Sequence, residues 1–212
     1  ETGMPTNMPS ARPFLGSGLR TGYWRSVGSV PEAFAVGGLM DELAVANNVD
    51  PFDLYQTLLP ERYHPMLALA REKSNWDAPL PAGWGHGIGF HNTWGATPVI
   101  QVAEVEVVAD KIRVHRVVCV IDCGRVINPD NVAAQMEGGI VFGLTAVLKN
   151  KINTINGEIQ ESNFHDYPLL QISEMPVVEV YTMASDSPPT GVGEMGVPPI
   201  APAVANAVFA AT

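Results

Sequence analysis

The chain carries little charge for its length. Of its 212 residues, 16% are charged and 46% are apolar. Disordered proteins have the opposite balance, so the sequence predicts a globular protein with a sizeable core. Because so few charges are available to cover the surface, we also expect part of that surface to be buried against other protein.

Basic residues and long apolar runs are scarce too. The formal net charge is −10, and no cluster of Lys and Arg occurs. A nucleic-acid groove needs a basic stripe, so no nucleic-acid partner is expected. No apolar run is long enough to cross a bilayer, and the N-terminal residues lack the pattern of a signal peptide, so we expect no membrane span.

Only two cysteines are present, Cys119 and Cys123. On a strand they would share one side with Cα atoms roughly 13 Å apart, which is too far for a disulfide. Two cysteines alone cannot hold a structural zinc or an iron–sulfur cluster, so we expect two buried thiols. His86 and His91 lie five residues apart, a spacing that suits a ligand pair on neither a helix nor a strand. They are expected to be hydrogen-bonded structural histidines.

Turn and cap residues predict an α+β fold with a mixed or antiparallel sheet and packed helices. Residues 1–22 are expected to be irregular. Caps and prolines predict helices over 31–48, from 51, over 64–73, over 129–148 and from 199 or 201. Alternating apolar residues predict strands over 85–108 and 111–122 with a turn at 109–111, a hairpin at Asn156-Gly157 and a strand over 175–185.

Two of the helices carry further expectations. In the first, four apolar residues form a face that we expect to be buried: Phe34, Leu39, Leu43 and Val45. The helix over 129–148 contains three glycines: Gly138, Gly139 and Gly143. Each weakens a helix by about 1 kcal/mol relative to alanine, so they predict a close approach by another backbone or by a ligand.

Glu194 is the one acidic residue in the last segment of the sequence, TGVGEMGVPPIAPAVANAVFAAT. Gly191 and Gly193 let the backbone approach a ligand, and the segment leads into a helix N-terminus, which attracts anions. The residues alone leave two interpretations open. Glu194 is either a general base held near a ligand or a surface glutamate in a flexible loop.

Two other groups of residues are equally ambiguous. Gln135, on the glycine-bearing helix, can donate to and accept from the edge of a cofactor, or it can be an ordinary surface residue. Trp24, Arg25 and Ser26 precede a helix start. An arginine and free N–H groups can bind an anion there, or the arginine can simply cover an aromatic surface.

Four segments occur together and in a characteristic order: GYWRSVGSVPEAFA, VIDCGRVINPDNVAAQMEGGIVFGL, NFHDYPLL and PPTGVGEMGVPPIAPAVANAVFAAT. Over nearly its whole length the chain resembles the molybdopterin-binding large subunits of the xanthine oxidase family. The nearest branch contains the isoquinoline 1-oxidoreductase beta subunit and periplasmic aldehyde dehydrogenases. The resemblance implies that residues 1–212 form the C-terminal molybdenum cofactor-binding region of a longer large subunit, with a fold of that type.

The resemblance also implies roles for residues at matching positions. Glu194 matches the active-site base of the family's GVGE loop. Gly191, Val192 and Gly193 of that loop would place backbone near the cofactor. Gln135 matches the glutamine that contacts the pterin.

A second matching segment lines the pterin and the substrate pocket in the family. Trp24, Arg25, Ser26 and Gly28 match it residue by residue. Val27 takes the position where xanthine-oxidising relatives carry a phenylalanine that stacks on the substrate. This departure argues against a purine substrate.

By the same resemblance, the chain is part of a molybdenum hydroxylase that oxidises an aldehyde or an N-heteroaromatic compound with oxygen derived from water. The implied cofactor is a molybdopterin in its cytosine dinucleotide form, whose metal no protein side chain holds. Implied partners are the N-terminal part of the large subunit, a small subunit with iron–sulfur clusters and a cytochrome c, in the bacterial periplasm. We expect no turnover from this chain alone. The alternative is a non-catalytic module that keeps the fold and binds no cofactor.

Overall fold

The structure is a computed structural model that describes residues 22–212, so the irregular segment expected over 1–22 lies outside the described residues except for Gly22. The α-helices are α1 (Ser29–Ala46), α2 (Pro51–Leu58), α3 (His64–Ser74), α4 (Pro129–Leu148) and α5 (Ile200–Ala211), with short 3-10 helices η1 (Glu61–Tyr63) and η2 (Ile172–Glu174). The strands are β1 (Trp84–Thr93), β2 (Thr97–Val108), β3 (Lys111–Ile121), β4 (Thr154–Ile155), β5 (Glu158–Ile159) and β6 (Val177–Thr182). The predicted helices and strands are confirmed within a few residues.

Four strands form one mixed sheet in the order β1-β2-β3-β6. The β1–β2 and β2–β3 pairs are antiparallel, and β3–β6 is parallel, with α4 in the crossover between them. The predicted turn between β2 and β3 has Ala109 and Asp110 at positive φ. The sequence did not predict the turn between β1 and β2, where Trp94 and Gly95 have positive φ. β4 and β5 form the predicted Asn-Gly hairpin.

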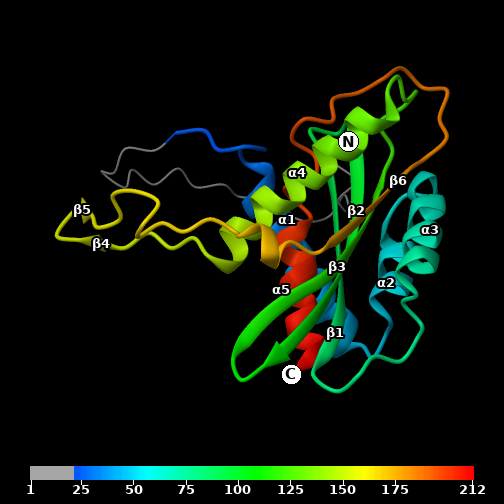
Figure 1. The fold of residues 1–212 in the computed structure, drawn as a ribbon. Helices are drawn as coiled ribbons and strands as arrows, with labels where there is room; N and C mark the ends of the chain where they lie inside the picture. The colour runs from blue at the N-terminus through cyan, green and yellow to red at the C-terminus, as the bar shows by residue number, and fades with distance from the viewer. Residues whose placement is uncertain (1–21) are drawn as a thin grey trace.

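Helices cover both faces of this sheet (Figure 1). On one face, alternate residues of β2 and β3 pack against α4 and α5: Val99, Ala103, Val117 and Cys119 are among them. On the other face the intervening residues pack against α2 and α3, including Ile100, Val102, Val118 and Val120. A sheet buried on both faces explains why these strands are nearly continuous apolar runs.

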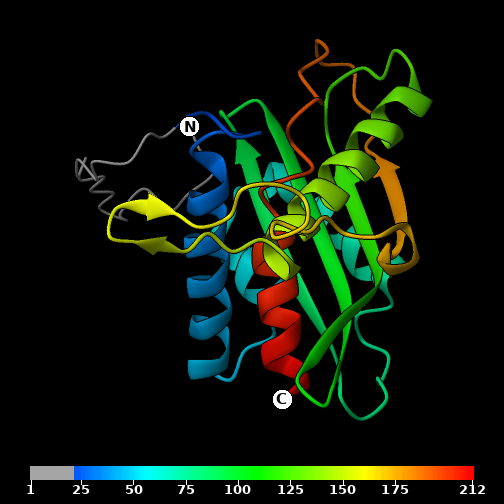
Figure 2. The ribbon, with the colours of Figure 1, turned by 60° about the vertical axis from the view of Figure 1, so that its left-hand side comes forward.

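Helix α5 packs directly against β1, and Figure 2 shows the two side by side. A Cβ atom on Gly85, Gly87 or Gly89 would overlap the backbone of the segment from Pro199 to Ala211. These three glycines alternate along β1 and face the helix, so the helix backbone lies directly on the strand. Asn206 of α5 is buried and donates from Nδ2 to the carbonyls of Ile88 (3.1 Å) and Gly37 (3.2 Å), which joins β1 to α1.

The prediction for the buried face of α1 was wrong. Phe34 is 52% exposed, and Leu39, Leu43 and Val45 are exposed as well. The helix instead buries a stripe of mostly small residues: Ser29, Ala33, Gly37, Met40 and Ala44. A Cβ on Gly37 would overlap the Pro202 ring of α5, so small residues are what allow the two helices to approach, and the larger side chains are displaced to the flanks.

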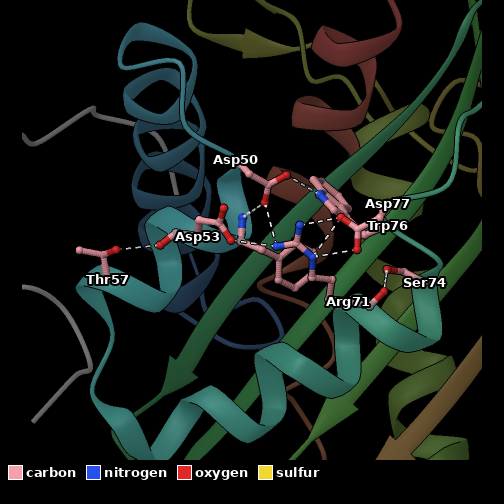
Figure 3. Close-up of polar contacts among 8 residues, drawn as sticks. Asp50, Asp53, Thr57, Arg71, Ser74, Trp76 and Asp77 are labelled. Carbon is pink, nitrogen blue, oxygen red and sulfur yellow. Dashed lines mark hydrogen bonds and ion pairs between the residues drawn. The ribbon is translucent and has the colours of Figure 1, made fainter.

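A polar cluster fixes α2 against α3 (Figure 3). Asp50 caps α2 by accepting from the Phe52 N–H (2.8 Å) and also accepts from Trp76 Nε1 (2.8 Å). Arg71 of α3 pairs with Asp50, Asp53 (2.9 Å) and Asp77 (2.6 Å). Its hydrogen bond holds the pKa of Asp77 below the usual range. The cluster confirms the predicted Asp-Pro start of α2.

Helix α4 also has the length and apolar composition of a membrane span, so the prediction that no run is long enough was too strict. Core helices pass the same test, and α4 packs seven buried residues into the protein: Val132, Met136, Gly139, Ile140, Gly143, Leu144 and Thr145. This packing is what brings α4 against the segment that precedes α5.

The contact between α5 and β1 leads to a stability prediction. Gly87→Ala would force a Cβ into the backbone of α5, so we expect a loss of several kcal/mol, since overpacking against a backbone that cannot move costs about 1–3 kcal/mol or more. Gly38→Ala is the control, because nothing lies within 4 Å of its Cβ position and alanine stabilises a helix by about 0.5–1 kcal/mol. Urea unfolding followed by circular dichroism measures both. Equal stability of the two variants would contradict this account of the packing.

Candidate active site

The segment from Thr190 to Pro199 is held against the ends of β2 and β3. Thr97, the first residue of β2, donates from Oγ1 to the Gly191 carbonyl (2.9 Å) and contacts Thr190 Oγ1 (2.7 Å). The Thr190 N–H donates to the Cys123 carbonyl (2.9 Å) just after β3. Buried Gln101 donates from Nε2 to the Gly196 carbonyl (2.9 Å). These contacts show that Glu194 lies in an anchored loop.

The segment before α1 meets this loop at Glu194. The Ser26 N–H donates to Oε1 of Glu194 (2.9 Å), and the Ser26 hydroxyl donates to the Glu194 carbonyl oxygen (2.6 Å). Ser26 and Val27 have φ of 75° and 50°. Positive φ is a strained conformation for a β-branched residue such as valine, and strain of this kind gathers at functional sites. The turn therefore holds the carboxylate by one oxygen at some conformational cost.

Arg25 connects the same loop to α4. Its Nε donates to the Gly193 carbonyl (2.7 Å), and its Nη2 donates to that carbonyl and to Gln135 Oε1 (3.1 Å). The ring of Trp24 stacks on that of Phe142, further along α4, with centroids 4.6 Å apart. The Arg25 guanidinium lies 5.9 Å from the centre of the Phe142 ring.

Two of the three glycines of α4 have the predicted role. A Cβ on Gly139 would lie 3.1 Å from Gly196 Cα, and one on Gly143 would overlap the Ile200 side chain. They let α4 approach the segment between the loop and α5. Gly138 has nothing within 4 Å of its Cβ position among the described residues, so the prediction of a close neighbour is not met there within this chain.

The structure thus brings most of the predicted site residues into one group joined by hydrogen bonds and ring stacking: Trp24, Arg25, Ser26, Gln135, Gly193 and Glu194. Gly191 and Val192 belong to the same loop, and Gly28 is the N-cap residue of α1. Val27 sits in the strained turn and is 44% exposed.

Sequence reasoning missed three residues that position this group. Thr97 and Gln101 hold the loop, and Phe142 supports Trp24. Gln101 did leave a signal, since it is a polar residue at a core-facing position of an apolar strand. Phe142 left none, because an apolar residue on α4 is equally suited to the core.

The glycines at 191 and 193 are not required by the chain's own packing. A Cβ on Gly191 would come no closer than 3.4 Å to Met195 Cε, and one on Gly193 no closer than 3.9 Å to Gln135 Oε1, which are ordinary contacts. Neither residue has positive φ. Within residues 22–212, no acceptor bonds the N–H groups of Gly191, Val192 and Gly193. An exposed backbone with free N–H groups and no side chains fits close approach by a bound group that carries hydrogen-bond acceptors.

The remaining predicted residues have structural roles. Burial raises the pKa of the Cys119 thiol to about 12 and that of Cys123 above its usual value, and both thiols are free and buried. His86 contacts Glu104 (3.3 Å) and His91 contacts Thr93 (3.0 Å), as expected for structural histidines. In the described part of the chain, no group of three or more His, Cys, Asp or Glu could hold a metal ion.

Comparison with known proteins identifies relatives of this chain. Residues 61–176 match the model of the molybdopterin cofactor-binding domain. The chain is 36% identical over 191 residues to the beta subunit of isoquinoline 1-oxidoreductase from Brevundimonas diminuta, covering 87% of this chain and 24% of that protein. It is 28% identical to a nicotinate dehydrogenase subunit from Pseudomonas putida, covering 92% of this chain and 18% of that protein.

Solved structures share the fold. The aldehyde oxidoreductase of Desulfovibrio desulfuricans superposes with a TM-score of 0.74 at 15% identity, over 89% of this chain and 39% of that one. The quinoline 2-oxidoreductase of Pseudomonas putida 86 gives 0.52 at 26% identity, over 54% of this chain and 16% of that one. The chain spans about a quarter or less of the curated relatives named above. It belongs to the molybdopterin cofactor-binding domain family, as part of a molybdenum-binding subunit of the xanthine oxidase type.

Proposed function

We propose that this chain supplies the general base and one wall of the cofactor site in a molybdenum hydroxylase. The substrate class is an aldehyde or an N-heteroaromatic compound, since relatives are named for isoquinoline, nicotinate and aldehydes. The observation that carries the proposal is the hydrogen-bonded group that joins Glu194, Ser26, Arg25 and Gln135 around an exposed glycine loop. The chain spans only part of its relatives, so we do not expect turnover from it alone.

The residues present fit a molybdopterin at this loop. The free N–H groups of residues 191–193 suit acceptors on the cofactor, and the glycines leave room for it. Gln135 uses Oε1 to accept from Arg25, so its amide nitrogen remains to donate to the pterin edge. Arg25 is held by Gly193 and Gln135, which fixes its positive charge beside the loop. The cofactor, when bound, supplies the redox metal centre at which water-derived oxygen is transferred.

Glu194 is positioned to take a proton. The Ser26 N–H bonds Oε1, which orients the carboxylate, and no residue of the described chain bonds Oε2. A carboxylate fixed by one oxygen can accept a proton at the other without first rotating into place. Glu194 is partly exposed, and its neighbour Gly193 carries no side chain.

We propose four further features from the sequence motifs alone. They are the cytosine dinucleotide form of the cofactor, iron–sulfur clusters on a small partner subunit, a cytochrome c acceptor and a periplasmic location. Val27 in place of the substrate-stacking phenylalanine supports a substrate other than a purine. In the contrasting case of a non-catalytic module, the assembled protein would fold but contain no molybdenum.

Glu194→Gln tests the base. The amide keeps the size of the carboxylate and can still accept from the Ser26 N–H, but it cannot take a proton. In the assembled enzyme we expect kcat to fall by about 10²-fold or more, a loss typical for removal of a general base, with molybdenum content unchanged. Activity within a few-fold of the parent would contradict the assignment, and loss of molybdenum would show a structural role instead.

Gly193→Ala tests the cofactor site separately. Its Cβ meets only an ordinary contact within the chain, so we expect the free energy of unfolding to change by less than about 0.5 kcal/mol. Molybdenum per assembled enzyme should drop several-fold, because the methyl group occupies the face left for the cofactor. Gly38→Ala, on α1 and away from the loop, is the control. Full molybdenum content in Gly193→Ala would contradict close approach at this residue.

A further inference from the structure

One part of the sheet has an open edge. Strand β3 pairs with β2 at every residue except His115, where the register shifts, but with β6 only from Arg116 to Ile121. Residues 111–115 therefore have a neighbouring strand on one side only. Within residues 22–212, no other segment makes a backbone hydrogen bond to them. In a strand, alternate N–H and C=O groups point to each side, so this edge presents unpaired groups.

A groove lies along this open edge. It has a volume of about 980 Å³ and is lined by residues 106 and 108–114, by residues 147–149 at the end of α4, and by Leu170, Ser173 and Glu174. Acidic and basic side chains both line it beside the apolar ones. Val108, Ile112 and Val147, which line it, are 57%, 42% and 37% exposed. Open strand edges with exposed apolar residues are aggregation sites unless they are covered, so the groove suits an apolar occupant with a backbone to pair.

The chain passes this edge as η2 and not as a strand, with Ser173 and Glu174 lining the groove. Pro176 precedes β6, and η2 is closed by a capping box between Gln171 and Glu174. Glu174 is engaged by Lys149 and by the Gln171 N–H (2.8 Å). The position opposite Arg113, where β6 would continue, is therefore not filled by an extended strand of the described chain.

The charges along β3 define what would fit there. The neighbouring strands already place acids beside the basic residues of β3: Glu104 of β2 lies opposite Arg116, Glu106 lies opposite Arg113, and Glu179 of β6 pairs with Arg116 (2.6 Å). The Glu106 carboxylate binds His115 (2.8 Å), and no ion pair within the described residues involves Arg113 or Lys111. Both are exposed on the open stretch.

We propose that residues 111–115 of β3 are a docking edge for an extended segment of another polypeptide, which adds a strand in line with β6. The side chains of the added segment alternate. Its apolar residues enter the groove beside Ile112, and its acidic residues face Arg113 and Lys111. β2, with the sequence VAEVEVV over 102–108, shows the pattern that pairs with this strand. Strand addition of this kind gains affinity from backbone bonds and specificity from alternate side chains.

A second copy of this chain fits the edge poorly. Two β3 edges paired antiparallel about their centre would place Arg113 opposite Arg113, and like charges directly opposite destabilise a strand pair. The docking edge is also separate from the proposed active site. β2 runs from Thr97 beside the Glu194 loop to Val108 beside the groove, which is roughly 35 Å at about 3.3 Å per residue. The two proposals can therefore fail independently.

The probe is a fluorescein-labelled peptide with the sequence of residues 102–108, compared with the same peptide carrying lysine in place of both glutamates. Fluorescence anisotropy with the whole chain should show saturable binding of the acidic peptide and at least tenfold weaker binding of the lysine peptide. Arg113→Glu should weaken the acidic peptide at least tenfold and favour the lysine peptide. Arg125→Glu, an equal charge change at another exposed arginine, should alter neither.

Hydrogen exchange locates the bound peptide. Alternate amides within 111–115 should exchange at least tenfold more slowly in its presence. The proposal is overturned by absence of saturable binding, by equal binding to the parent and Arg113→Glu, or by protection only outside this stretch. Light scattering without peptide measures whether the chain itself forms a dimer. A dimer that Arg113→Glu alters would assign the edge to a second copy and also overturn the proposal.

Discussion

The direct contact of α5 with β1 is the constraint on which the rest of the fold depends. Three glycines on one side of β1 let the helix backbone lie on the strand, and a Cβ at any of them would overlap it. Gly139 and Gly143 do the same for α4 where it crosses the segment from Gly196 to Ile200. β1 and α4 therefore both contact the chain where the segment from Gly196 to Ile200 leads into α5. Because backbone atoms cannot adjust as flexible side chains do, these contacts fix the position and direction of that segment.

This packing is why the loop before α5 can hold a positioned carboxylate. The loop is fixed at its end by α4 and β1 and at its start by Thr97 and Cys123. Gln135 lies one helical turn before Gly139, so the close approach of α4 also sets the height of Gln135 beside Gly193. Arg25 and Ser26, which precede α1, complete the group through their hydrogen bonds to Gln135, Gly193 and Glu194. The strain at Ser26 and Val27 is offset by the hydrogen bonds that Arg25 and Ser26 make to the loop and to α4.

The structure shows where the apolar residues of this weakly charged chain lie. Apolar residues cover both faces of the sheet, and others remain exposed on α1 and beside the open edge of β3. Phe34, Val45 and Ile112 are examples, at 52%, 56% and 42% exposure. The chain spans only part of each relative, and the expectation that some of this surface contacts other protein stays a prediction.

The sequence by itself determined the elements and the family. Asp-Pro and Asn-Pro pairs start α2 and α4, and the Asn-Gly pair makes the small hairpin, because these signals act through local backbone geometry. Glu194, Gln135 and the Trp24–Ser26 segment could be named from their motifs, but the connection that Arg25 makes from its segment to Gln135 and Gly193 could not, since it spans more than 100 residues of sequence.

Tertiary structure alone decided which surfaces are buried. The larger apolar residues of α1 predicted the wrong face, because burial there depends on how closely α5 approaches and not on hydrophobicity along the helix. The same holds for the α4 glycines: Gly139 and Gly143 meet the segment before α5 and Gly138 does not, although all three look alike in the sequence. The apolar pattern of β3 likewise does not indicate that residues 111–115 lack a partner on one side. Their pairing depends on where β6 begins, which is opposite Arg116. Distances between segments remote in sequence are set by packing, and no local pattern encodes them.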